Sequence, residues 1–143
     1  MIIPDLNLLL YAADSTVPQH AKARVWWEEA LNGQTRVGLS WSVLIGYMRI
    51  STNRRIVSQP LTVPEATRDI HEWLDRRVVD VIEPTQRHLS VLSGLLEPIG
   101  VGGNLIQDAH LAALAIEYGG EIHSADRDFE RFAGVRYRNP LTD

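Results

Sequence analysis

The chain has 143 residues, of which 45% are hydrophobic and 22% charged, a composition that suits one folded domain spanning residues 1–143. It contains no cysteine, which excludes disulfides, thiolate metal sites and cysteine nucleophiles. Its net charge of −4 gives no overall basic character for nonspecific binding of nucleic acid. No apolar run approaches the ~20 residues of a membrane span and no signal peptide is visible, so we expect a cytoplasmic location and no membrane contact.

The first eleven residues predict a buried strand that leads at once into a helix. Ile2 and Ile3 are β-branched, Asp5 follows a proline, and an apolar run occupies 8–11. Asp5 therefore stands at the C-terminal end of the strand. There it can cap the helix, face a crevice at the strand ends, or do both.

Helices and strands are expected to alternate through the rest of the chain. Ser40 is the expected N-cap of one helix, and Thr62 with Glu65 has the spacing of a capping box for another. The expected helices cover 18–31, 41–51, 62–77, 85–96 and 104–117. The expected strands after the first cover 35–39, 78–83, 121–125 and 135–138. This alternation favours an α/β fold with a parallel sheet and right-handed crossovers.

Four acids fall where such a fold would gather them. Asp5 and Asp126 end strands, Asp128 follows closely, and Asp108 lies one turn into a helix that is otherwise apolar. Two unit charges ~5 Å apart repel by roughly 3 kcal/mol at an effective dielectric constant of about 20. Such carboxylates need raised pKa values or a counter-ion, and Mg²⁺ (or Mn²⁺) is the divalent cation that suits oxygen ligands.

Each acid also has an ordinary structural explanation. Asp5 alone is more often a helix cap than a metal ligand, Asp108 can be a helix-start charge, and residues 126–128 can form an Asx turn. His110 and His123 flank the acids, but a packed or hydrogen-bonded histidine is the more common role. The metal hypothesis rests on three separate segments whose acids one fold would bring together.

Five segments carry a resemblance to a known family. They are IIPDLNLLLYA (2–12), SWSVLIGYMRISTN (40–53), NLIQDAHLAALAIEYG (104–119), IHSADRDFERF (122–132) and RNPL (138–141). In these segments the chain resembles PIN-domain ribonucleases, most closely VapC-type toxins of bacterial toxin–antitoxin pairs. The resemblance implies a three-layer α/β/α fold with a central parallel sheet of four to five strands, the first and fourth adjacent.

The resemblance also implies an activity and partners. These are cleavage of single-stranded regions of RNA such as tRNA or rRNA, dependent on Mg²⁺ or Mn²⁺, a homodimer, and a cognate VapB-type antitoxin. It makes Asp5, Asp108 and Asp126 the expected metal ligands. Asp128 is expected to be a fourth catalytic carboxylate that assists them.

Other side chains are assigned supporting roles around the carboxylates. Asn7 and Asn104 are expected to hydrogen-bond the cluster, and Ser124 to orient Asp126. Arg49, with Arg54 and Arg55, is a candidate for binding RNA phosphates, because arginine contacts phosphate in a bidentate manner. For Arg49 an ion pair with an aspartate is an equally good explanation.

One departure from the family pattern leaves an alternative function open. Gly46 stands about where PIN nucleases often carry a further acid, so a weak or inactive PIN-like module that binds RNA or protein is the alternative. Phosphotransferases of the haloacid-dehalogenase type and response-regulator receivers need a late lysine, but Lys22 is the only lysine. A dinucleotide-binding domain needs an early glycine pattern, whereas the run 100–103 is late.

Overall fold

The structure, a computed structural model, describes residues 1–142 and is built on a parallel sheet of five strands. The strands are β1 (Ile2–Pro4), β2 (Val37–Ser40), β3 (Val79–Ile82), β4 (Glu121–His123) and β5 (Arg136–Arg138). Their order is β3-β2-β1-β4-β5. The adjacency of the first and fourth strands is thus confirmed, and the last predicted strand does form an edge of the sheet.

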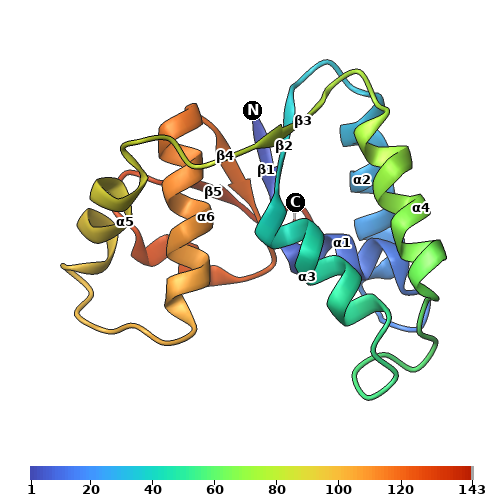
Figure 1. Cartoon of the computed structure of the whole chain (residues 1–143). Helices are drawn as coiled ribbons and strands as arrows, with labels where there is room; N and C mark the ends of the chain where they lie inside the picture. The colour runs from blue at the N-terminus through green and yellow to red at the C-terminus, as the bar shows by residue number, and fades with distance from the viewer. Residues whose placement is uncertain (143) are drawn as a thin grey trace.

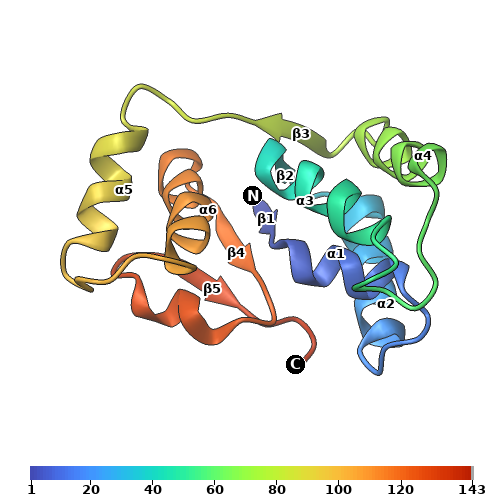
Figure 2. The same ribbon diagram turned by 60° about the horizontal axis from the view of Figure 1, so that its bottom comes forward.

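Helices cover both faces of the sheet and complete a three-layer α/β/α arrangement. They are α1 (Leu6–Ala13), α2 (His20–Asn32), α3 (Trp41–Ser51), α4 (Val63–Leu74), α5 (His88–Leu96), α6 (Leu105–Tyr118) and the 3₁₀ helix η1 (Arg127–Arg131). Helices α1 to α4 lie on one side of the strands, and α5 and α6 lie on the other (Figure 1 and Figure 2). None of the helices in residues 1–142 has both the length and the apolar character to cross a membrane.

The predicted helix caps are confirmed. Asp5 caps α1, where its side chain accepts a hydrogen bond from the backbone N–H of Leu6 at 2.8 Å. Ser40 caps α3 by accepting from the N–H of Val43, and Thr62 forms the predicted capping box at the start of α4. These short polar contacts fix the residue at which the chain passes from strand or loop into helix.

Two helices begin later than predicted, at His20 and His88, rather than at 18 and 85. The N–H of His20 bonds to the carbonyl of Val17, and Thr85 accepts from the N–H of Arg87 at 3.1 Å, so both approaches are turns. Helix α4 also ends at 74 rather than 77, because residues 75–79 form the turn into β3. Local hydrogen bonding of this kind shortens helices that the apolar pattern alone overextends.

The core fills the space between the sheet and its helices. Ile3, Leu39 and Ile122 on the strands are fully buried, and Leu8 on α1 is also buried. Tyr47 on α3 is fully buried as well, and its ring packs edge-on against Trp73 at a centroid distance of 4.7 Å. This core places α1 and α3 beside the C-terminal ends of the central strands, where the polar residues lie.

Candidate metal site at the C-terminal edge of the sheet

The polar residues that follow β1 and β4 lie together at one edge of the sheet. Pro4 of β1 pairs with His123 of β4, so Asp5 and Ser124, the next residue of each chain segment, lie side by side. The Ser124 hydroxyl donates to Asp5 Oδ2 at 2.7 Å, and the N–H of Asp5 donates to the carbonyl of His123 at 2.9 Å. This edge is where ligands bind in open parallel sheets.

A small hydrogen-bond network fixes Asp5. Besides the bonds from Leu6 and Ser124, its carboxylate accepts from the Asn7 amide at 3.3 Å. Asn7 also donates to Ser124 and accepts from the N–H of Ala125. Burial raises the pKa of Asp5, the bonds from Ser124 and Leu6 act against that, and the charge of Asp126 raises it further. Asp5 is therefore a helix cap and a member of the charged site at once.

Three other carboxylates form a compact trio. Asp108 comes from the first turn of α6, and Asp126 and Asp128 come from the start of η1, with ligand oxygens within 4.8 Å of one another. Asp126 accepts from the N–H of Asp128 at 2.9 Å, and its own N–H donates to the Ser124 hydroxyl at 2.9 Å. The Asx turn expected from the sequence is therefore also present, and it is what aims these two side chains at Asp108.

The negative charge of Asp5 acts on this trio through Asp108. The pKa of Asp108 rises from its ordinary value of 3.8 to about 7, first because of burial and then because of the charges of Asp5, Asp126 and Asp128. No hydrogen bond to the Asp108 carboxylate is present within residues 1–142 to offset this. An unneutralised cluster of acids is therefore a cost to the folded state, which a bound cation would relieve.

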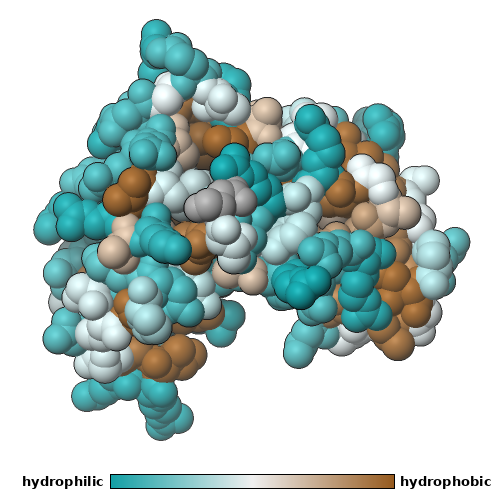
Figure 3. Space-filling model, turned by 180° about the vertical axis from the view of Figure 1, so that it is seen from behind, coloured by the Kyte–Doolittle hydropathy of each residue, from teal (hydrophilic) through white to brown (hydrophobic). Residues whose placement is uncertain are grey.

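Two of the four carboxylates border a hollow of about 550 Å³ between α1, α3 and α6. Asp5 and Asp108 line it together with Gly46, Arg49 and Trp41. Two residues that line the hollow are well exposed, Trp41 at 49% and Ile45 at 55%, so the hollow is open to a polymeric ligand rather than enclosed around a small one. Seen from behind, the molecule as a whole has a notch at its lower edge (Figure 3).

Residues 2–135 match the PIN domain family. The chain belongs to this family. Ribonuclease VapC33 of Mycobacterium tuberculosis is 45% identical over 143 residues, which is 100% of both chains. Ribonuclease VapC37 of the same organism is 40% identical over 140 residues, covering 98% of this chain and 97% of that protein.

Solved structures agree on the PIN fold. VapBC2 from Rickettsia felis, in complex with a DNA fragment from its promoter, aligns with a TM-score of 0.70 at 19% identity over 97% of this chain and 98% of that one. VapC20 from Mycobacterium tuberculosis, described as a sarcin-ricin loop cleaving toxin, aligns with a TM-score of 0.63 at 18% identity over 95% and 99%. At such identities the likeness establishes the fold, and the three-layer prediction is confirmed.

The donor set of this PIN domain fits a hard divalent cation. Every group in the trio is a carboxylate oxygen, the ligand type that Mg²⁺ and Mn²⁺ prefer. The two histidines near the acids have other partners, since His110 bonds to His88 at 2.8 Å and His123 bonds to Trp26 at 3.0 Å. They have the hydrogen-bonded roles that the sequence favoured.

The supporting residues fall into two groups. Asn7 and Ser124 are in the network, as described. Asn104 is exposed at the start of α6 and makes no hydrogen bond to the carboxylates within residues 1–142, so its role remains a prediction. Arg49 is exposed and lines the hollow, and the described residues include no ion pair between it and an aspartate.

Leu6 lies against the position where the family often carries an acid. Gly46 is buried, and a Cβ atom built there would lie 2.6 Å from Cδ2 of Leu6. A larger residue at 46 would require the flexible end of the Leu6 side chain to move. In this chain the site therefore takes no acid from α3.

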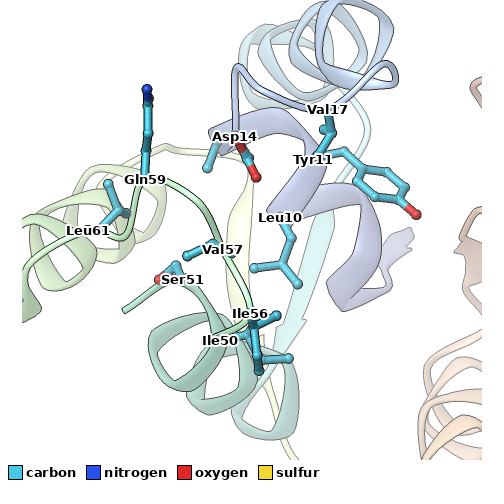
Figure 4. Close-up of a pocket in the computed structure, with 11 residues that line it drawn as sticks. Leu10, Tyr11, Asp14, Val17, Ile50, Ser51, Ile56, Val57, Gln59 and Leu61 are labelled. Atoms are coloured by element: carbon cyan, nitrogen blue, oxygen red, sulfur yellow. The ribbon is translucent and has the colours of Figure 1, made fainter. Parts of the chain in front are cut away.

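A separate, mainly apolar cavity lies farther along α1 and α3. It encloses about 210 Å³ and is lined mainly by apolar side chains such as Leu10, Ile50 and Ile56, from α1, α3 and the loop that follows α3 (Figure 4). Its one carboxylate, Asp14, accepts hydrogen bonds from Thr16. This cavity does not include any of the four carboxylates of the metal site.

Sequence reasoning missed two features beside the metal site. Trp41, the first residue of α3, is 49% exposed at the rim of the hollow. The buried carboxylate of Glu117 accepts from Thr85 and from His88 Nδ1, and His88 continues the chain to His110. Burial, and then His88, lower the pKa of His110. The sequence offered one signal, and it concerned Trp41: this tryptophan lies off the apolar face predicted for α3.

Proposed function

We propose that the chain acts as a VapC-like ribonuclease toxin. As a single PIN domain over residues 1–143, it would hydrolyse phosphodiester bonds in single-stranded regions of RNA such as tRNA or rRNA, in the cytoplasm, with Mg²⁺ or Mn²⁺. A cognate VapB-type antitoxin would neutralise it, and it would act as a homodimer. The observation that carries this proposal is the group of four carboxylates at one sheet edge, open to a polymer and electrostatically linked through Asp108.

The residues have distinct tasks in this proposal. Asp108, Asp126 and Asp128 would hold the cation, with Asp5 beside them. A bound divalent cation supplies Lewis-acid stabilisation of charge on the phosphoryl oxygens and lowers the pKa of bound water. Ser124 donates to Asp5 and accepts from the N–H of Asp126, so it holds the two central aspartates in fixed positions.

Arg49 is the candidate for gripping substrate. It lies three residues beyond Gly46 on the face of α3 that lines the hollow. With its guanidinium exposed and no aspartate paired with it within residues 1–142, it can bind an RNA phosphate bidentately. Arg54 and Arg55, also exposed and just beyond α3, extend this positive surface.

The second candidate function is a PIN module that binds RNA or protein without cutting. Gly46 is the feature that favours it, but the comparisons with known proteins give it no support. A gathering of acids also opposes it, because unneutralised carboxylates repel phosphate. A protein that only bound RNA would gain nothing from keeping the half-buried Asp108 beside three other negative charges.

An RNA-cleavage assay tests the proposal. The purified chain, free of any antitoxin, is incubated with tRNA and rRNA fragments in Mg²⁺, in Mn²⁺ and in EDTA. The matched variants are Asp126→Asn, which keeps an oxygen acceptor for the N–H of Asp128, and Asp75→Asn, an exposed acid at the end of α4. We expect cleavage with metal by wild type and Asp75→Asn, and none by Asp126→Asn. Cleavage that survives in Asp126→Asn or in EDTA would refute the metal-dependent mechanism.

The partner is proposed from the relatives rather than from the contacts of this chain. The R. felis structure contains a VapBC2 complex, so an antitoxin partner is the natural expectation here. Induced expression of the chain alone should arrest bacterial growth, and Asp126→Asn should not. Growth arrest that persists in Asp126→Asn would show that toxicity does not come from the carboxylate site.

A further inference from the structure

A second hollow adjoins the metal site across the first turn of α3. It measures about 330 Å³ and lies between the start of α3, the end of β3 and α6. Trp41 and Ser42 line both hollows, so nothing but this turn separates them. On α6, Asp108 faces the first hollow and His110 and Leu114 face the second. A strand of RNA with its phosphate at the carboxylates would have a base within reach of this space.

Trp41 supplies an apolar wall that is free to take a partner. It is the one tryptophan of the described chain that is among the exposed large hydrophobic residues, at 49%. Within residues 1–142 its ring stacks on no other aromatic ring, and its indole N–H makes no hydrogen bond. Aromatic side chains displayed beside a cleft are the usual stacking surfaces for bases of single-stranded RNA.

A hydrogen-bond relay holds His110 in the polar wall. The carboxylate of Glu117 is buried and can only accept, so His88 Nδ1, 2.5 Å away, carries a hydrogen. His88 Nε2 in turn shares a hydrogen bond with His110 Nδ1 at 2.8 Å. The relay therefore fixes the position of the His110 ring and leaves its Nε2 outside these bonds.

Glu83 supplies the charged group of the second hollow. Its side chain is exposed, and its carboxylate accepts hydrogen bonds. Ser40 and Ser42 also line the hollow, and their hydroxyls bond to each other at 2.9 Å. No described arginine or lysine lines this hollow, in contrast to Arg49 in the first. Its polar wall therefore suits a ligand edge that donates N–H groups, and it disfavours an edge dominated by carbonyl oxygens.

We infer that the second hollow binds the base of a nucleotide adjoining the scissile phosphate, with Trp41 stacking on the base and the Glu83 carboxylate accepting from its edge. The inference rests on the proposed ribonuclease function and adds a specificity site to it. An amino-bearing base (adenine, cytosine or guanine) is selected over uracil, whose single N–H lies between two carbonyl groups. Trp41 and Glu83 thus contribute to the choice of cleavage site.

Binding is measured separately from cleavage. Hexaribonucleotides of adenine, cytosine or uracil are titrated into the Asp126→Asn protein, with and without Trp41→Ala, Trp41→Phe or Glu83→Gln. Trp41→Ala should weaken binding of the adenine oligomer about tenfold or more, and Trp41→Phe should restore most of it. Glu83→Gln should reduce the preference for adenine and cytosine over uracil. Val63→Ala, at an exposed apolar position on α4, is the control and should change nothing.

Cleavage mapping on a randomised RNA library provides the second readout. Wild type should show a depletion of uracil at one position next to the cut, and Trp41→Ala should lose it while Mn²⁺ binding stays unchanged. An unaltered cleavage profile and unaltered oligomer binding in Trp41→Ala would overturn the base site and leave the nuclease standing. If the wild-type protein cleaves no RNA but oligomer binding depends on Trp41, the ribonuclease proposal fails and the base site stands.

Discussion

Replacing Asp108 by Asn should make the metal-free protein more stable. The Asp108 carboxylate makes no hydrogen bond within residues 1–142, and its pKa is raised from 3.8 to about 7 by burial and by the charges of Asp5, Asp126 and Asp128. Above pH 7 the folded protein must hold this charge in an unfavourable place. Asparagine has nearly the same shape and no charge, so it removes the penalty.

The magnitude and its pH dependence follow from the shift. A pKa that rises from 3.8 to about 7 corresponds to about 4 kcal/mol, which screening of this half-buried group by solvent reduces to about 2 kcal/mol. Because the folded state binds the proton more tightly than the unfolded state, wild type loses stability as pH rises from about 4 to about 7. The advantage of Asp108→Asn should therefore be absent at pH 4 and complete at pH 8.

Urea unfolding in EDTA at pH 4, 6 and 8 measures this difference. Asp75→Asn is the control, because it removes one exposed carboxylate of the same type and should change the free energy of unfolding by no more than a few tenths of a kcal/mol at any of the three pH values. An Asp108→Asn protein that is equally or less stable than wild type at pH 8 would refute the reasoning. It would mean that the four carboxylates do not repel one another as the geometry requires.

Three further predictions concern the framework of the site. Tyr47→Phe removes the bond from the buried Tyr47 hydroxyl to Asp69 at 2.6 Å, and urea unfolding should show a loss of about 1.5 kcal/mol with RNA cleavage unchanged; an unchanged midpoint would contradict this. Thr62→Ala removes the cap of α4 and should lower the free energy of unfolding in the same assay by about 1 kcal/mol. An unchanged free energy of unfolding would show that the cap is dispensable. For Glu117, burial raises the pKa, but hydrogen bonds from Thr85 and His88 outweigh burial and hold the pKa below 4.5. Its stabilising contribution is thus present above pH 4.5 and lost as pH falls, so Glu117→Gln should be destabilised at pH 6 and approach wild type near pH 3, whereas a pH-independent difference would show that charge is not involved.

Much of the fold followed from short-range features of the sequence. Asp5, Ser40 and Thr62 mark helix starts through bonds to a backbone N–H one to three residues away, and such bonds form wherever the chain enters a helix. Their partners are close in sequence, so the pattern contains the whole interaction. The convergence of Asp5 with Asp126 also followed, because parallel strands that are neighbours end at the same edge.

Features that depend on distant partners did not follow. The sequence did not show that Asp128 lies in the compact trio or that Ser124, 119 positions away, holds the Asp5 carboxylate. The direct role of Asp5 and the assisting role of Asp128 stay predictions. The relay from Glu117 to His110 depends on how α5 packs on α6, and no local spacing encodes that. The burial of Gly46 against Leu6 is likewise a contact between helices.

Isothermal titration with Mn²⁺ tests the central claim, that the carboxylates at the sheet edge form one cation site. The antitoxin-free wild type, Asp126→Asn and the Asp75→Asn control are titrated at pH 8, where Asp108 is ionised. The account predicts one Mn²⁺ per chain for wild type and Asp75→Asn, and loss of binding for Asp126→Asn. Equal binding by all three proteins, or none by wild type at millimolar Mn²⁺, would contradict it.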